Sequence, residues 1–554
     1  MFRKRDAQGS LFESSLLIPA AKAKRLQGSW AETFRQRALP LIDEEIFAPL
    51  YCEDNGRPNR PVQTVFGVLL LKDMFDLTDA QTLEQLEYNL QWHHALHLTA
   101  EEAHLPQKTL HNFRARLLAH DEGRLAFAAT TDRIIEALGP RVSHQRLDST
   151  HVISNIAVLT RLRLLCETTR LFLSRLKAAH PRLYGRVPQG LLGRYLKEDD
   201  SATSYGDAPS DKGRRRLCVC ARDLYRLCAL LRGTAAQGME EFALVERLLQ
   251  EQCEVVKKKQ CPSRDDDDAG EGRVPVVLKA AKDVRSASLQ SPHDADATYN
   301  GRKGKGYETQ VSESCHPDND VEVITHVEVT DACASDAQAT IPVLQALADR
   351  GQQPEVLTAD TTYGSGENAV AAERMGTELV SPVSGPAVAV EEESSGDRAL
   401  SGADFHLDPR GEDPAVCPGG HFSTDQRLKA ARANHLELTF DRQTCEDCPL
   451  FHLCPATLNQ EAGAYTLTVD LVAANLQRRR RAEANGDFKP RYAIRAGIEA
   501  TNSELKRGHG LDDLRVRGRP RVVLAVHLKA LACNLKRMVR ALTPKPGDLL
   551  PAMA

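Results

Sequence analysis

The feature that most restricts the fold of this chain is an ordered alternation of strand and helix patterns over residues 307–383. Two strand-like runs come first, YETQVSES and VEVITHVEVTD, followed by a helical pattern over about 335–350. A strand (EVLTAD), a helix over about 368–375 and a strand (ELVSPV) complete the series. An earlier run, 142–152, also has strand character. This order predicts an α/β domain built on a mixed sheet.

The N-terminal part has a helical pattern. Apolar residues recur at helical spacing from 61 to about 117, with Thr78 and Asp79 as the expected N-cap between two runs. A further helix follows Pro106 and carries His111 and Arg114. This all-α unit serves either as a structural lobe or dimer interface, or as a DNA-binding unit that uses its last helix.

Length and charge narrow the possible functions. The 554 residues correspond to roughly three or four domains, and 42% hydrophobic with 27% charged residues is ordinary globular composition. A formal charge of −4 excludes a bulk positive field, but 17 Lys or Arg against 6 Asp or Glu lie between residues 478 and 540. Clusters at 478–481 (RRRR) and 515–521 (RVRGRPR) would hold a phosphate backbone, with a solvated basic face as the alternative, and 301–306 (GRKGKG) would be a flexible turn. No apolar run is long enough to span a membrane, which predicts an intracellular protein.

The segment RYAIRAGIEATNSELKR, residues 491–507, is the richest in candidate chemistry. On a regular helix one stripe carries polar side chains: Tyr492, Arg495, Glu499 and Lys506. The opposite face, which would pack on the sheet, carries Ile494, Ile498, Thr501 and Leu505. Geometry alone leaves a second interpretation open, a solvated face with an i,i+4 ion pair between Arg495 and Glu499.

Two other carboxylates stand at positions suited to a metal site. Asp360 closes the strand EVLTAD, and side chains at the carboxyl ends of strands favour ligand binding in α/β sheets. Asp148 lies in the earlier strand RLDSTHV. Either residue alone would more often be a turn former.

With these residues the chain resembles the DDE transposases of bacterial insertion sequences, closest to the 1182-type within the insertion-sequence 4/5 superfamily. Their last catalytic acid lies in a Tyr-x2-Arg-x3-Glu-x6-Lys signature, which the polar stripe matches without a gap. RLDSTHV resembles the strand of the first Asp, LTADTTYGS the turn of the second, and HGLDDLRVRG followed by NLKR the region after the Glu helix. Residues 56–98 resemble the N-terminal domain, and the resemblance covers most of residues 50–540.

The resemblance implies a ribonuclease-H-like core in which Asp148, Asp360 and Glu499 bind two Mg²⁺ or Mn²⁺ ions. It further assigns three residues to DNA phosphates: Tyr492, Arg495 and Lys506. It implies cleavage of double-stranded DNA at element ends, strand transfer into target DNA, a homodimer in the synaptic complex, and a cytoplasmic, nucleoid-associated protein. Glu504 is a rival third ligand, but it sits about 150° around the helix from the polar stripe, so Glu499 is preferred.

Two other functions stay open. One is a transposase-derived DNA-binding protein without catalysis, and the other is a metal-dependent nuclease without strand transfer.

Four cysteines form a second group of candidate metal ligands: Cys417, Cys445, Cys448 and Cys454. A close Cys-x2-Cys pair with two further thiols is typical of a structural zinc site, although the last spacing is looser than in a zinc ribbon. His421 and His452 are substitute ligands. The alternative is a set of incidental or buried thiols.

These features predict an α/β protein with a ribonuclease-H-like catalytic core, a helical N-terminal domain, a helical insert and a Cys-rich insert. The expected order is a helical domain (1–135), the first core strand (140–155), a helical insert with an acidic linker (156–290), the rest of the core (291–384), the Cys-rich insert (385–470) and a basic C-terminal helix region (471–542).

Overall fold

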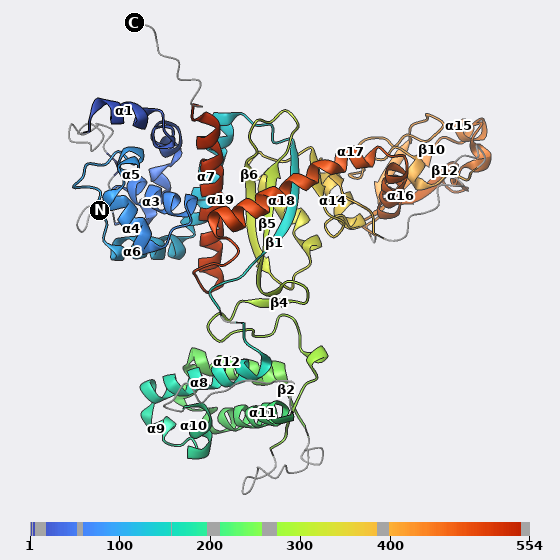
Figure 1. The fold of residues 1–554 in the computed structure, drawn as a ribbon. Coiled ribbons are helices and arrows are strands. Elements are labelled where there is room, and N and C mark those ends of the chain that lie inside the picture. The colour runs from blue at the N-terminus through green and yellow to red at the C-terminus, as the bar shows by residue number, and fades with distance from the viewer. Residues whose placement is uncertain are drawn as a thin grey trace.

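The computed structural model describes Phe2 and residues 4–5, 18–52, 59–156, 158–196, 211–256, 274–384, 398–430 and 432–544. The expected α/β class is confirmed, with helices packed around a central mixed sheet (Figure 1). A helical N-terminal part lies on one side of this sheet, and a small second sheet lies on the opposite side. A helical insert extends from one end of the central sheet (Figure 1). Among the described residues, no helix is both long and apolar enough to cross a membrane.

The N-terminal part is built from α1 (Ala20–Gln27), α2 (Trp30–Thr33), α3 (Val62–Met74), α4 (Asp79–Tyr88), α5 (Leu90–Ala95), α6 (Gln107–His120) and α7 (Glu122–Leu138). Thr78 caps α4, because its hydroxyl accepts from the backbone N–H of Gln81 while the Gln81 side chain accepts from the N–H of Thr78. Pro106 immediately precedes α6. The expected helix starts at these two residues are therefore confirmed.

The helical insert comprises α8 (Arg161–Ala179), α9 (Pro181–Tyr184), α10 (Gln189–Tyr195), α11 (Asp211–Leu231) and α12 (Glu240–Gln252), followed by a short hairpin of β2 (Cys253–Val255) and β3 (Val276–Leu278). It buries its own apolar core, which includes Phe172, Leu224 and Leu248. The expected acidic linker at 265–268 lies outside the described residues.

The central sheet contains β4 (Thr298–Asn300), β5 (Gly304–Ser314), β6 (Ile324–Asp331), β1 (His144–Val152), β7 (Val356–Ala359) and β8 (Glu378–Val380). β5 pairs antiparallel with β1, β4 and β6, whereas β1, β7 and β8 are parallel. All the strands expected at 142–152 and 307–383 are present. α13 (Thr340–Ala348) connects β6 to β7 and α14 (Gly366–Met375) connects β7 to β8, and their apolar residues pack against Leu147 and Leu357 on one face of the sheet.

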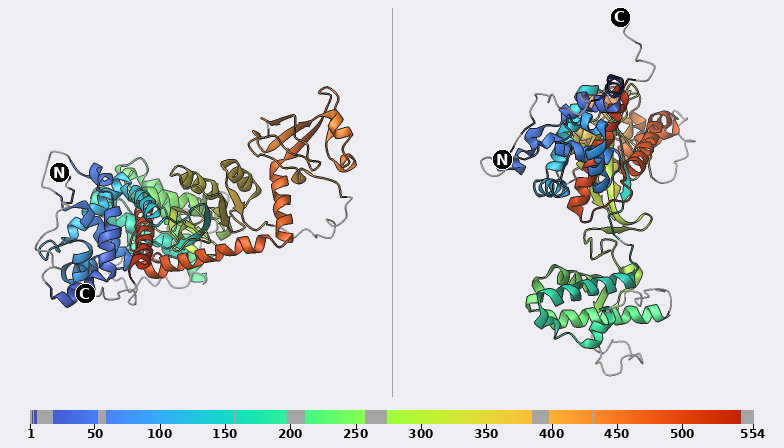
Figure 2. Two further views of the ribbon diagram at one scale, coloured as in Figure 1. Left: turned by 90° about the horizontal axis from the view of Figure 1, so that it is seen from above. Right: turned by 60° about the vertical axis from the view of Figure 1, so that its left-hand side comes forward.

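The C-terminal part forms a second sheet before it returns to the first. β9 (Asp425–Leu428), β10 (His435–Phe440), β11 (Thr457–Asn459) and β12 (Ala464–Asp470) make a four-stranded sheet with the short helix α15 (Arg442–Glu446). The helices α16 (Leu471–Ala484), α17 (Phe488–Ala493) and α18 (Gly497–Ser503) then lead back to the central sheet, and α19 (Arg519–Leu542) joins the N-terminal helices (Figure 2). Residues 385–397 of the expected Cys-rich insert lie outside the described part of the chain.

Candidate active site

Asp148 lies in β1, and Asp360 directly follows the adjacent parallel strand β7. β1 and β7 pair with Leu147 opposite Ala359, so the two aspartates follow paired residues on neighbouring strands, and Asp360 is among the charges that raise the pKa of Asp148. Leu147 and Ala359 point into the core under α13 and α14. Because side chains alternate along a strand, the Asp148 carboxylate is directed to the opposite face of β1, which α18 covers. Asp360 begins the turn after β7, where its Oδ1 accepts from the backbone N–H of Thr362 at 2.8 Å.

Arg495 connects this aspartate pair to Glu499. Its Nη2 lies 3.1 Å from Oδ1 of Asp148, and its Nη1 lies 3.6 Å from Oε1 of Glu499. Asn502, one turn beyond Glu499, donates from Nδ2 to Oδ2 of Asp148 at 3.2 Å. The helix segment thus contacts the first aspartate through a cation and an amide, with Glu499 beside them.

The segment from 491 to 507 is helical but not a regular α-helix, and on this point the sequence-based expectation was wrong. A 3₁₀ turn occupies Ile494–Ala496, and a π turn occupies Glu504–Gly508. The expected buried face is present at Ile498, Thr501 and Leu505. The π turn changes the angular step after Ser503, and Lys506 pairs with Asp512 at 3.3 Å.

Arg146 holds the start of this helix against the sheet. It lies two residues before Asp148 and donates from Nη1 to the carbonyl oxygen of Ile494 at 3.0 Å and from Nε to Glu313 at 2.8 Å. Gly497 makes room for it, because a Cβ at that position would lie 2.0 Å from Nη1 of Arg146. Glu313 is fully buried and also pairs with Arg537 of α19. The Glu313 carboxylate, on β5, therefore links Arg146 of β1 to Arg537 of α19 beneath the helix.

The Asp148 carboxylate is buried and lies near two other carboxylates, those of Glu499 and Asp360. The residue is only 7% exposed, and burial raises its pKa to about 6. Arg495 opposes this rise, while the nearby Glu499 and Asp360 carboxylates add to it. The pKa of Tyr492 is raised by burial and by Asp360 and Asp148, and lowered by Arg495. The phenol, the guanidinium and the acids therefore lie in one electrostatic neighbourhood.

The donor set suits a hard divalent cation. Three carboxylates offer oxygen ligands, and the Oδ1 atom of Asn502, buried beside Asp148, has no hydrogen-bond partner within the described residues. The three carboxylates do not all come within 4.8 Å of one another, and the side chain of Glu499 is 64% exposed. Asp148, Asp360 and Glu499 are the residues that could hold such a cation.

Glu504, the rival third acid, faces the other way. Its Oε2 accepts from Nε of Arg537 at 2.9 Å, and Arg537 belongs to α19. Glu499 is among the charges that raise the pKa of Asp148, and its Oε1 lies 3.6 Å from the Arg495 guanidinium that pairs with Asp148. The geometry therefore favours Glu499.

The four arginines at 478–481 were expected to hold phosphates, but at least three of them make contacts within the protein. Arg479 donates to the carbonyl oxygens of Gly364 and Ser381 at 2.9 and 2.8 Å. Arg481 pairs with Asp404 at 2.7 Å, and Arg478 lies 3.7 Å from Glu373. These side chains attach α16 to the central domain and to the Cys-rich part.

The second basic cluster is also engaged within the protein. Arg515 donates to the carbonyl oxygen of Leu77 at 2.9 Å, and Arg519 pairs with Asp331 at 2.8 Å. Of the segment 301–306, expected as a flexible turn, residues 301–303 form the tight turn between β4 and β5, and residues 304–306 are the start of β5, paired with β4. Charge counts in the sequence could not distinguish such internal partners from a DNA backbone.

Sequence reasoning missed two residues of this site, Asn502 and Arg146. Asn502 lies three residues after Glu499 and therefore on nearly the same helix face, so helical spacing could have identified it. Arg146 lies two residues before Asp148 and therefore on the same face of the strand. Its partner carbonyl is 348 residues away, and no local pattern indicates that contact.

The four cysteines lie near one another beside the second sheet. A Cβ at Gly419 would lie 3.6 Å from Sγ of Cys417 and 3.1 Å from Sγ of Cys448. Burial raises the pKa of Cys445 to about 11, with Cys454, Cys417 and Cys448 adding to the rise. The four sulfurs do not all lie within 4.8 Å of one another. The ring of His421 also borders Gly419, and His452 lies in the turn Phe451–Leu453 between the last two cysteines.

Two family models match the chain. Residues 416–539 match one described as "Transposase DDE domain", and residues 27–116 match one described as "Transposase domain (DUF772)". Both matches show that these two segments are similar to transposase domains. The transposase match at 416–539 contains Glu499 and the four cysteines and leaves both aspartates outside it. DDE transposases generally use divalent metals and bind DNA. No curated protein and no solved structure matched the chain.

Proposed function

We propose that this protein is a transposase that cuts double-stranded DNA at the ends of its element and joins the freed 3′-hydroxyl to target DNA. In this proposal the central sheet is a ribonuclease-H-like core, and Asp148, Asp360 and Glu499 hold two Mg²⁺ or Mn²⁺ ions. The observation that carries it is the placement of Asp148 in β1 and of Asp360 directly after the adjacent parallel strand β7, with Arg495 between Asp148 and Glu499.

Divalent ions at this position would activate the attacking hydroxyl and neutralise charge on the phosphate. The protein side chains prepare the site. With a pKa of about 6, Asp148 is mostly ionised at neutral pH and available as a ligand. Arg495 holds Asp148 and Glu499 on one guanidinium, which is also the group best suited to a bidentate phosphate contact.

Tyr492 and Lys506 complete the proposed phosphate contacts. Tyr492 shares the electrostatic neighbourhood of Arg495 and the two aspartates. Lys506 pairs with Asp512, whose side chain is 69% exposed, and exposed pairs of this kind contribute only about 0–1 kcal/mol. A DNA phosphate can therefore displace Asp512 at little cost.

Two further parts of the proposal concern assembly. Acting on two element ends together requires two active sites, so the working unit is a homodimer on DNA. The four cysteines bind a structural zinc that stabilises the second sheet and takes no part in the chemistry.

The test uses the full chain with Mg²⁺ and DNA carrying the sequences that flank its coding region on either side. Wild type should cut and join this DNA, whereas Asp360→Asn and Glu499→Gln should bind it without cutting. Glu367→Gln, at an exposed carboxylate on α14, is the matched control and should act like wild type. Binding without cleavage by the wild type would instead indicate a DNA-binding protein. Cutting without joined products would indicate a nuclease.

A further inference from the structure

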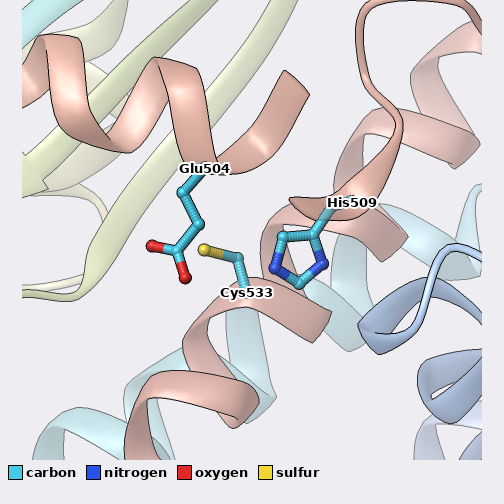
Figure 3. A group of neighbouring side chains, drawn as sticks. All are labelled: Glu504, His509 and Cys533. Carbon is cyan, nitrogen blue, oxygen red and sulfur yellow. The ribbon is translucent and has the colours of Figure 1, made fainter. Parts of the chain in front are cut away.

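Glu504, His509 and Cys533 form a second group of potential metal ligands, separate from the three acids (Figure 3). One ligand atom from each residue lies within 4.8 Å of the other two. Glu504 opens the π turn that ends the Glu499 helix, His509 follows that turn, and Cys533 lies in the middle of α19. The group therefore joins the end of the catalytic helix to the C-terminal helix.

His509 has the arrangement of a ligand histidine. The residue is fully buried, and its Nδ1 lies 2.8 Å from the carbonyl oxygen of Asp73. Because a carbonyl oxygen only accepts hydrogen bonds, Nδ1 carries the proton and Nε2 presents its lone pair. Nε2 is buried and has no hydrogen-bond partner among the residues that the structure describes. A backbone carbonyl that fixes the tautomer in this way is a common second contact of metal-binding histidines.

Glu504 and Cys533 supply the other two donor atoms. Nε of Arg537 donates to Oε2 of Glu504 at 2.9 Å, and the Cys533 thiol also hydrogen-bonds to this carboxylate, a bond that a bound cation would replace. Cys533 is fully buried, and burial raises the pKa of its thiol to about 12. Without a metal ion the thiol therefore stays protonated, whereas a bound cation would favour the thiolate and release the proton to solvent.

We propose that Glu504, His509 and Cys533 bind a zinc ion, distinct from the catalytic cations and from the zinc of the four cysteines. One oxygen, one nitrogen and one sulfur are donors that zinc accepts, whereas Mg²⁺ would not select a thiolate or an imidazole. The protein supplies three ligands, and solvent fills the fourth position from the side of the half-buried Glu504.

The charges around the group can accommodate the ion. Arg537 is neutralised by Glu313 as well as by Glu504. Lys529 lies near Asp73 and Asp76, at 3.4 and 3.7 Å from their carboxylates. The ion would fix the π turn to α19 and, through the Asp73 carbonyl, to α3 of the N-terminal part. The ion would thus join the N-terminal part, whose residues 27–116 match a transposase family model, to the helix that carries Glu499.

The experiment measures zinc bound per chain after the full-length protein is stripped with a chelator, given excess Zn²⁺ and passed through a desalting column. Cys533→Ser and Glu504→Gln should each bind one zinc ion fewer than wild type. Cys315→Ser is the matched control, since Cys315 is equally buried and its pKa is likewise raised to about 12 by burial, and it should keep the wild-type content. Cys445→Ser should lose only the zinc of the four cysteines.

Replacing the zinc with Co²⁺ allows the same site to be followed by its absorption spectrum. A thiolate-to-cobalt charge-transfer band should be present in Cys445→Ser and absent from the double variant Cys445→Ser, Cys533→Ser. If Glu504→Gln and Cys533→Ser both retain the full wild-type zinc content, the proposal is overturned. Where Cys533→Ser does not fold, Glu504→Gln decides the question, because its side chain is half-buried and its amide oxygen can still accept from Arg537.

Discussion

Arg146 donates to the carbonyl oxygen of Ile494 at 3.0 Å, and this contact joins the strand of Asp148 to the helix of Glu499. The two residues are 348 positions apart. The same guanidinium binds the buried Glu313, so its position is fixed from below by the sheet. The relative placement of the proposed acids therefore depends on a side chain that would touch neither the metal nor the DNA.

Gly497→Ala should disturb this placement. The added Cβ would lie 2.0 Å from Nη1 of Arg146, and overpacking of this kind typically costs about 1–3 kcal/mol. We expect lower stability in urea unfolding and a loss of DNA cleavage. Gly508→Ala, on the same helical segment, is the control, because its Cβ would meet only Cγ of Glu504 at an ordinary 3.7 Å. Equal stability losses in both variants would contradict the steric explanation.

Asp148→Asn should stabilise the metal-free protein at neutral pH. The folded-state pKa of about 6 lies above the ordinary value of 3.8, so the wild type loses stability as pH rises through 6, whereas the Asn variant does not. The gain at pH 7.5 should be on the order of 2–3 kcal/mol and should disappear below about pH 4. Thermal melts in chelator across this pH range check it, with Glu367→Gln as control. A variant less stable than wild type at pH 7.5 would show that the carboxylate is not under strain.

Arg495→Ala should change the pH dependence of cleavage. The guanidinium lowers the pKa of Asp148, so its removal should move the acid limb of the pH–rate profile upward by about one unit or more. Lys506→Ala should instead weaken DNA binding without moving that limb, since Lys506 pairs with Asp512. Initial cleavage rates at saturating DNA between pH 5 and 9 separate the two effects. An unmoved acid limb in Arg495→Ala would mean that Asp148 does not govern the profile.

Cys445→Ser should remove zinc from the Cys-rich part and destabilise it. An ion present at 100 times its dissociation constant stabilises the folded state by about 2.7 kcal/mol. Metal analysis combined with thermal melting measures both changes. Cys52→Ser alters an exposed cysteine in the N-terminal part and should change neither. Wild-type protein that copurifies with no zinc and takes up none would refute the assignment.

Local patterns predicted the fold where the cause of the structure was itself local. The cap at Thr78 and the strands of the central sheet follow from polar and apolar residues a few positions apart. The four short strands between 425 and 470 were not predicted. β10 (HLELTF) and β12 (AYTLTVD) alternate apolar and polar residues, but each is short and lies in a segment rich in Gly, Pro and Cys.

The candidate site shows the limit of such reasoning. Helical spacing placed Arg495 beside Glu499 correctly, because that contact lies within one turn. The 3₁₀ turn at 494–496 coincides with the bond from Arg146, and the π turn begins at Glu504, which binds Arg537. Both contacts come from distant segments, so the helix irregularities, and with them the position of Lys506, could not be derived from residues 491–507 alone.

The shared core of the N-terminal helices and α19 has a consequence for synthesis on the ribosome. Phe66, Phe113 and Ile134 belong to the same apolar cluster as Leu531 and Val539, so the first helices bury their surface fully only when the last helix arrives. The pairing of β1 with β7 likewise spans some two hundred residues, which makes the contact order of this domain high and its folding slow. A chain that ends before residue 519 would expose this apolar surface and lose the bonds from Arg537 of α19 to Glu313 and Glu504. We expect such a fragment to be proteolysed rapidly.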